Sequence, residues 1–366
     1  MFRKMPIILL SFILLVILMN PWLSIEVKSQ IYAISLFIKS CIIFVLPLLI
    51  FMLLFKTIAQ VSKGATKVIG LILVALCVSN FMSTMLGYCV GTCLYQVDFT
   101  LTAPPQMVGL EPSWVLQMPK WIANDQAMFG ALILGFLGSM FMPALSSKIA
   151  IRFEVYSGWV FRMLTALVPI FVVGFVMKLV HDKLLTQILS QYAVILIVIA
   201  AAVFTYIIFV YFIASRLSVA RSLRCLKNML PAAITGFSSM SSAAAMPLTI
   251  EASEKNTEDP QLARLAAPMT VSTHLMGDCF AIPILAFAVM KHFAVVEPTL
   301  VSYVVFALYF VLAKFSVAAI PGGGIIVMLP ILEKQLGFTS EMGSLITALY
   351  ILFDPVITCA NIQGNG

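Results

Sequence analysis

Residues 238–247 read SSMSSAAAMP, a run of small residues that ends in a proline and lies between two apolar stretches. Four serines fall within five positions here, although 62% of the chain is hydrophobic and only 10% is charged. Small residues in such a chain indicate one of two structures. They permit close packing between membrane helices, or they mark backbone that leaves the helix beside a water-filled cavity. The segments around this stretch decide between the two.

The composition is typical of an integral membrane protein. Mean hydropathy is +1.08, and helices of about 20 apolar residues are long enough to cross a bilayer. Arg3 and Lys4 precede the first apolar run, and no clear small-residue cleavage site follows it, so we predict a retained first helix. Before residue 215, the apolar segments are residues 7–18, 33–55, 68–95, 127–142, 160–179 and 194–213.

The formal net charge of +7 comes from basic residues in the loops between these segments. Every second loop is basic, and such loops stay on the cytoplasmic side of a membrane. We therefore predict a multi-pass protein of the cell (inner) membrane with a cytoplasmic N-terminus. Because the basic residues are spread over loops instead of forming one surface, we expect no binding to nucleic acid.

The second half of the chain has interrupted apolar segments. Residues 228–250 contain two prolines and the serines, and residues 300–330 contain PGGG at 321–324. Each apolar arm is shorter than a full span, so a short helix, a polar tip and a second short helix predict a re-entrant hairpin. Helix packing explains either stretch alone. Two such segments in one half of a chain, with ionisable residues between them, favour a transporter binding site.

Three ionisable side chains lie within the apolar spans of this half. His274 and Asp278 are four residues apart, which places them on one face of a helix predicted over 260–290. Asp354 lies in the last span, followed by a proline. A charged side chain at the bilayer centre costs about 2.5–3.5 kcal/mol on insertion scales, so its default interpretation is functional. For His274, a purely structural hydrogen bond is the alternative.

The chain resembles the dicarboxylate/amino acid:cation symporter family, which has the glutamate-transporter fold. SSMSSAAAMPLTIEASEKN (238–256) is similar to the tip of the first hairpin of that family, and IPGGGIIVMLPIL (320–332) to the tip and second arm of its second hairpin. FDPVITCANIQGN (353–365) is similar to its last helix, where the pattern is D-x-x-R-T-x-x-N-x-x-G-D. The resemblance covers nearly the whole chain and is strongest over residues 228–366.

The resemblance implies an all-α integral membrane protein with eight transmembrane helices, two re-entrant helical hairpins and an elevator mechanism. Residues 1–227 would form six transmembrane helices, of which helices 1, 2, 4 and 5 are a scaffold and helices 3 and 6 belong to the transport domain. The implied assembly is a homotrimer. The core of the transport domain would consist of hairpin 1 at 228–256, helix 7 at 260–290, hairpin 2 at 300–340 and helix 8 at 341–363, within residues 228–366.

The resemblance also implies a site for an amino acid zwitterion, with no enzymatic step and no cofactor. Asp354 matches the carboxylate that pairs with the substrate ammonium group, while Ser241 and Ser242 match the tip that binds its carboxylate. Broken helices favour this arrangement, since their N–H groups attract an anion. The other substrate-binding residues by this match are Ile320, Pro321, Gly322, Ile357, Thr358 and Asn361.

One departure from the family concerns the substrate. Ile357 replaces the arginine that pairs with an acidic substrate side chain, and an alkyl group cannot make that bidentate contact. We therefore predict a symporter of a small neutral amino acid. Three alternatives stay open. They are a symporter of acidic amino acids or dicarboxylates that uses His274 or Lys314 as the cation, a membrane sensor that binds without transport, and an aspartyl protease that uses Asp278 and Asp354.

A second departure concerns the coupling ion. Met276, within HLMGD at 274–278, stands where the family has an aspartate that binds sodium, and Asn365 replaces another. Hard cations prefer oxygen ligands that carry negative charge. We therefore expect only weak sodium sites, or H⁺ in place of Na⁺ as the coupling ion. The residues expected to carry coupling are Thr270, Ser272, His274, Asp278, Asn361 and Asn365, with third-helix partners among Ser79, Asn80, Ser83 and Thr84.

Lys314 lies in the first arm of the second predicted hairpin. Two interpretations of this cation stay open. Its ammonium group replaces a bound sodium ion, or its long side chain extends to the surface and has no role in the site. The expected partners of the protein are the bilayer and a small-molecule substrate, an amino acid or a small organic acid.

Overall fold

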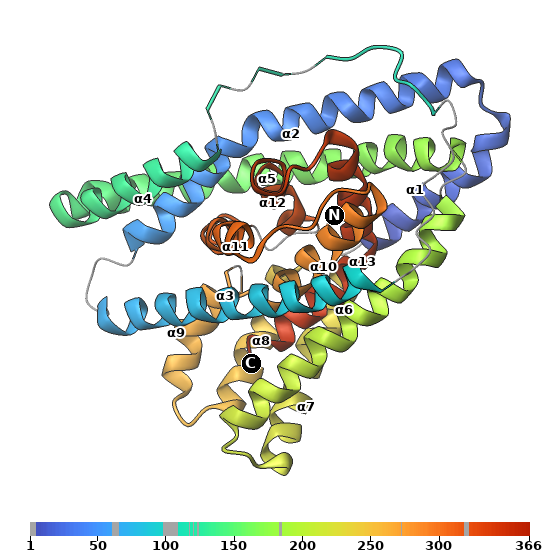
Figure 1. The fold of residues 1–366 in the computed structure, drawn as a ribbon. Coiled ribbons are helices and arrows are strands. Elements are labelled where there is room, and N and C mark those ends of the chain that lie inside the picture. The colour runs from blue at the N-terminus through green and yellow to red at the C-terminus, as the bar shows by residue number, and fades with distance from the viewer. Residues whose placement is uncertain are drawn as a thin grey trace.

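The structure is a computed structural model, and every regular element that it describes is a helix (Figure 1). The described residues are 5–60, 66–97, 109–116, 118–119, 121–122, 124–182, 185–271, 273–317 and 322–366.

The first half of the chain folds into long helices. They are α1 (Met5–Met19), the short 3-10 helix η2 (Asn20–Trp22), α2 (Ile25–Gln60), α3 (Thr66–Gln96), α4 (Asn124–Phe141), α5 (Pro143–His181) and α6 (Leu185–Ala214). The helices of the second half are shorter. They are α7 (Val219–Ser239), α8 (Ser242–Asn256), α9 (Pro260–Thr270), α10 (Met276–His292), α11 (Leu300–Lys314), α12 (Gly323–Leu336) and α13 (Ser340–Gln363).

By length and composition, three described helices are able to cross a bilayer. They are Gly70–Gln96, Tyr192–Ala214 and Ser340–Gln363. The first two expose most of their side chains, as lipid-facing helices do, whereas Ser340–Gln363 is mostly buried within the protein. α13 is therefore an apolar helix that the protein itself surrounds.

The helices pack in two groups. In the first, α2 contacts α4 and α5, and α1 contacts α5. In the second, α10 and α13 lie in the middle and contact each other, α10 also contacts α3 and α6, and α13 also contacts α7 and α8 (Figure 1). Fewer contacts connect the groups, mainly between α12 and α2 and between α13 and α5. The interrupted segments of the sequence therefore all belong to the second group.

The serine stretch forms the turn between α7 and α8, which pack against each other. Met240 ends α7 in the left-handed region at φ 52°. Ser241 then begins α8, because its hydroxyl accepts a hydrogen bond from the backbone N–H of Ala244 at 3.3 Å. Such a cap satisfies one of the free N–H groups at the start of a helix. α11 and α12 form a second packed pair, joined by residues 315–322.

The helix predicted over 260–290 is divided into α9 and α10. Residues 271 and 273–275 lie outside both helices, so the expectation that His274 and Asp278 share one helical face is wrong. The break depends on Asn80 of α3. Its side-chain amide donates to the carbonyl of Thr273 at 2.7 Å and accepts from the N–H of Leu275 at 3.3 Å. Partners of this kind are what non-helical backbone needs at membrane depth.

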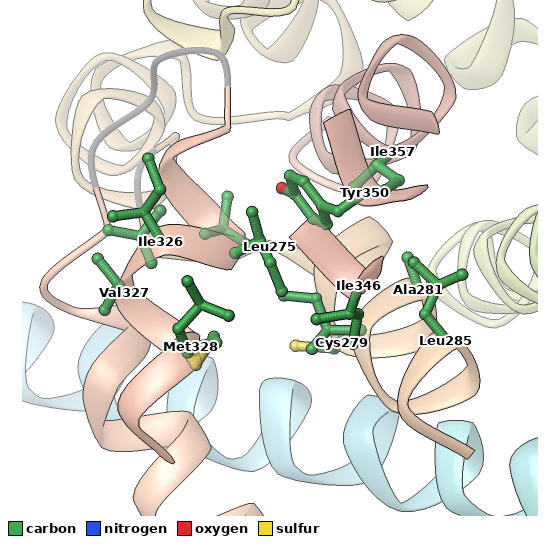
Figure 2. Packing of buried hydrophobic residues seen from close by; sticks show 14 of the residues in the cluster. Leu275, Cys279, Ala281, Leu285, Ile326, Val327, Met328, Ile346, Tyr350 and Ile357 are labelled. Carbon is green, nitrogen blue, oxygen red and sulfur yellow. The ribbon is translucent and has the colours of Figure 1, made fainter. Parts of the chain in front are cut away.

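Apolar side chains from α10, α12 and α13 fill the space between these helices (Figure 2). The first turns of α12 contribute Ile326, Val327 and Met328, while Leu275 and Cys279 lie between them and Ile346 of α13. All six are buried. This apolar packing holds the broken ends of the helices next to one another and shields the polar groups among them from solvent.

Candidate functional site

Four interrupted or buried elements meet at one small cavity: the α7–α8 turn, the α9–α10 break, the α11–α12 connection and the middle of α13. The cavity has a volume of about 20 Å³, room for roughly one water molecule. It is too small for an amino acid, so binding one requires these elements to move apart. The lining residues are Met240, Ser242, Leu275, Asp278, Val317, Gly324, Tyr350, Asp354, Thr358 and Asn361.

Asp354 is a buried carboxylate with neutral partners. It is 2% exposed. Its Oδ2 atom accepts a hydrogen bond from the backbone N–H of Gly322 at 2.8 Å, and its Oδ1 atom accepts one from the hydroxyl of Thr358 at 2.9 Å. None of the ion pairs among the described residues includes Asp354. Among the described residues, the carboxylate therefore lines the cavity without an ion-pair partner.

Asp278, the second carboxylate of the cavity, is paired with Lys314. The Nζ atom of Lys314 lies 2.8 Å from Oδ2 of Asp278, and the two side chains are 0% and 1% exposed. The Oδ1 atom of Asp278 accepts hydrogen bonds from the Tyr350 hydroxyl at 2.8 Å and from the amide of Asn361 at 3.2 Å. Both oxygens of this carboxylate are thus satisfied within the protein.

Lys314 is the last residue of α11, and its ammonium group lies inside the protein. Besides Asp278, the ammonium group contacts the face of the Phe310 ring, 4.4 Å from its centroid. A cation over an aromatic face is attracted by the ring quadrupole. The interpretation in which Lys314 extends to the surface is therefore wrong, because a buried carboxylate and an aromatic ring already hold the charge.

Gly324 permits the close approach of α12 to this ion pair. A Cβ atom at that position would overlap with Oδ2 of Asp278 and with the Tyr350 hydroxyl. Gly322, which precedes α12, has a φ of 71°, a conformation that glycine adopts without strain. Glycine is therefore favoured at two positions of the PGGG sequence for separate reasons, a steric one at Gly324 and a conformational one at Gly322.

The four serines of the quoted stretch have different roles. Ser238 and Ser239 donate back to carbonyls of α7, those of Ile234 and Thr235. Ser241 caps α8, as described above, and Ser242 lines the cavity. Of the two serines predicted to bind the substrate carboxylate, Ser242 is thus placed at the cavity and Ser241 at the start of its helix.

Only some of the other residues predicted to bind the substrate lie at the cavity. Thr358 and Asn361 line the cavity, and the N–H of Gly322 contacts Asp354. Ile357 is buried in the apolar core and does not line the cavity. Ile320 and Pro321 lie outside the described residues.

His274 and Asp278 have separate partners. The Nε2 atom of His274 lies 2.9 Å from the Ser79 hydroxyl, and its Nδ1 atom lies 3.2 Å from Oδ1 of Asn365. The amide of Asn365 also donates to the carbonyls of His274 and Asn361. His274 therefore joins the break after α9 to α3 and to the end of α13.

The remaining residues predicted for cation coupling offer few free oxygens. The carbonyl of Thr270 already accepts from the N–H groups of His274 at 2.7 Å and of Thr273 at 3.0 Å. Met276 is buried in the apolar core. Ser272 lies outside the described residues. Among the third-helix residues, the buried hydroxyl of Ser83 has no hydrogen-bond partner in the described part of the protein.

Sequence reasoning missed Tyr350 and Gly324 and did not connect Lys314 with Asp278. One signal for Tyr350 was present, since it lies four residues before Asp354 and therefore on the same face of α13. No comparable signal pairs Lys314 with Asp278, because residues 36 positions apart meet only in the folded chain.

A comparison with protein families gives a match. A model described as the sodium:dicarboxylate symporter family matches residues 8–366, nearly the whole chain. No curated protein matches it in sequence.

Proposed function

Because the chain belongs to the sodium:dicarboxylate symporter family, and is therefore a cation-coupled membrane transporter of a small molecule, we propose that its substrate is a small neutral amino acid. The proposal is carried by Asp354. This buried carboxylate lines the cavity and forms no ion pair with the described residues, so it is complementary to a ligand cation, and the α-ammonium group of an amino acid supplies one.

The α7–α8 turn supplies the matching site for the substrate carboxylate. Ser242 lines the cavity at the first turn of α8. Helix N-termini carry a partial positive charge and free N–H groups, and both favour an anion. A zwitterion between Ser242 and Asp354 would thus face a donor-rich helix end on one side and a carboxylate on the other.

We infer a neutral substrate side chain from the positions of the cations near the cavity. The lining of the cavity includes no lysine, arginine or histidine among the described residues. Lys314 is held by Asp278, and His274 is held by Ser79 and Asn365. An acidic amino acid or a dicarboxylate would leave its second carboxylate without a cation, which argues against this alternative.

A binding screen followed by an uptake assay tests the proposal. Purified protein is heated with each common amino acid and each C4 dicarboxylate, with and without sodium, and the melting temperature is measured. A neutral amino acid should raise it most, whereas stabilisation by dicarboxylates alone would overturn the proposal. Uptake of the stabilising compound into proteoliposomes then separates a transporter from a sensor that only binds.

We further propose an elevator mechanism in a homotrimer, with the N-terminus in the cytoplasm. The packing of the helices in two groups with few contacts between them supports this mechanism, because the second group can then move past the first. The scaffold would be α1, α2, α4 and α5. Native mass spectrometry should give three copies, and a monomer in mild detergent would contradict the trimer.

The coupling, we propose, differs from the sodium scheme of the family. Met276 and Asn365 replace two carboxylate ligands, and His274 is the group at this place that would take a proton instead. Under this proposal, uptake into proteoliposomes follows an inward proton gradient, and His274→Asn abolishes the accumulation while binding persists. Strict sodium dependence without any response to the gradient would refute it.

A further inference from the structure

We propose that the ammonium group of Lys314 occupies, as a permanent part of the protein, a cation site at the carboxylate of Asp278, which Tyr350 and Asn361 hold in place. The inference rests on the proposed transport function and deepens it. In a cation-coupled transporter, a site of this kind would otherwise take a mobile cation. Here the chain supplies the charge from α11.

The contacts of Asp278 define the site. One carboxylate oxygen receives the Lys314 ammonium at 2.8 Å, and the other receives the Tyr350 hydroxyl at 2.8 Å and the Asn361 amide at 3.2 Å. The backbone N–H of Asp278 donates to the side-chain oxygen of Asn361 at 3.2 Å. The carboxylate is thus fixed by α10 and α13, while its cation comes from a different helix.

Burial makes a cation at this position necessary. Lys314 and Asp278 are 0% and 1% exposed, and a buried carboxylate without a counter-charge is strongly unfavourable. Removing the ammonium group would therefore leave a vacant position beside a buried negative charge, on a carboxylate whose other oxygen is held by Tyr350 and Asn361. Hard cations such as sodium take carboxylate oxygens as ligands. The vacated position should accordingly select a small cation.

The position of Lys314 gives a functional consequence to having a lysine ammonium group in place of a mobile cation. The residue ends α11, whereas Asp278 lies in the first turn of α10 and Tyr350 in α13. The ion pair therefore joins the α11–α12 pair to the two central helices. A mobile cation would leave this site during each cycle, but a lysine side chain cannot. Lys314 would then compensate the negative charge of Asp278 in every state of the cycle, and no ion would be transported at this site.

The test measures sodium binding directly and uses no substrate. Purified full-length protein is heated in sodium chloride or in choline chloride at equal ionic strength. The variants are Lys314→Met, which vacates the position, and Lys314→Met with Asp278→Asn, which also removes the negative charge. Lys291→Met is the matched control, because this ammonium group of α10 contacts the carbonyls of Tyr95 and Val97 and, among the described residues, no carboxylate.

We expect sodium to raise the melting temperature of Lys314→Met specifically, since a ligand that binds only the folded state stabilises it. Wild type, the double variant and Lys291→Met should melt equally in the two salts. If Lys314→Met folds in sodium chloride but not in choline chloride, this dependence on sodium also supports the proposal. If it fails to fold in both salts while the double variant folds, or if it folds without a sodium effect, the proposal is wrong. Neither result bears on whether an amino acid binds at Asp354.

Discussion

Asp278 and Asp354 are two buried carboxylates of the same small cavity, and they differ in their partners. Asp278 has the Lys314 ammonium at 2.8 Å. Asp354 has a backbone N–H at 2.8 Å and a hydroxyl at 2.9 Å, both neutral donors. The chain thus compensates one negative charge with its own cation and leaves the other to neutral groups. We infer that the first has a fixed role in the protein and that the second receives the ligand.

The comparison shows that a carboxylate in an apolar span does not by itself mark a ligand site. Both aspartates look alike in the sequence, as acidic residues within hydrophobic segments, and both are buried in the structure. Their partners decide their roles, and those partners come from other helices. Breaking each set of contacts in turn should therefore give different losses, in stability for Asp278 and in ligand binding for Asp354.

The largest expected effect is on stability. Lys314→Met leaves Asp278 buried without its cation, and removing one partner of a buried pair typically costs about 3–5 kcal/mol. Adding Asp278→Asn removes the unpaired charge and should recover most of this loss. Unfolding of both variants in sodium-free buffer measures the difference. If Lys314→Met were as stable as wild type, the ion pair would contribute nothing to the stability of the folded state.

Asp354→Asn should instead reduce ligand binding. An ammonium group would face a neutral amide in a poorly hydrated cavity, and truncating one side of such a charge pair costs about 2–5 kcal/mol, roughly 30-fold or more in affinity. The amide oxygen still accepts a hydrogen bond, so stability should change little. Titration with the amino acid that stabilises wild type most gives the affinity. Unchanged affinity would remove Asp354 from the site.

Tyr350→Phe sharpens the description of Asp278. The change removes one donor to a charged acceptor, and such hydrogen bonds contribute about 1.5–3 kcal/mol. The loss should be smaller than that of Lys314→Met because Asn361 and Lys314 still contact Asp278. Chemical unfolding in detergent compares the two variants. Equal losses would indicate that the charge of Lys314 is not the main partner.

Gly324→Ala tests the close approach of α12. The added methyl group would overlap with Asp278 and Tyr350, and overpacking of this kind costs typically about 1–3 kcal/mol. Gly158→Ala in α5 is the control, since a Cβ atom there meets nothing within 4 Å. It should leave the melting temperature unchanged or raise it slightly. Equal behaviour of the two variants would show that α12 has room to shift.

The sequence predicted those features that its motifs carry. The resemblance to the family assigned Asp354, Thr358 and Asn361 to the substrate site, and all three line the cavity. The serine stretch was expected to interrupt a helix, and it forms the turn between α7 and α8.

The features that depend on distant residues could not be predicted. The break after α9 has Asn80 as its partner, which is 193 positions from Thr273 in the chain, so the sequence predicted a helix over 260–290 and not the place where it divides. For the same reason, the sequence left two interpretations of Lys314 open. Helical spacing places residues on a face, but it does not indicate which charge of another helix lies opposite.

One measurement tests the central claim most directly, that Asp354 receives a ligand ammonium group and Asp278 does not. It compares binding of the most stabilising neutral amino acid with binding of the same compound without its amino group. Wild type should bind only the amino acid, and so should the variant with Lys314→Met and Asp278→Asn. Asp354→Asn should lose this preference. If Asp354→Asn keeps the preference and the double variant loses it, the assignment of the two carboxylates is reversed.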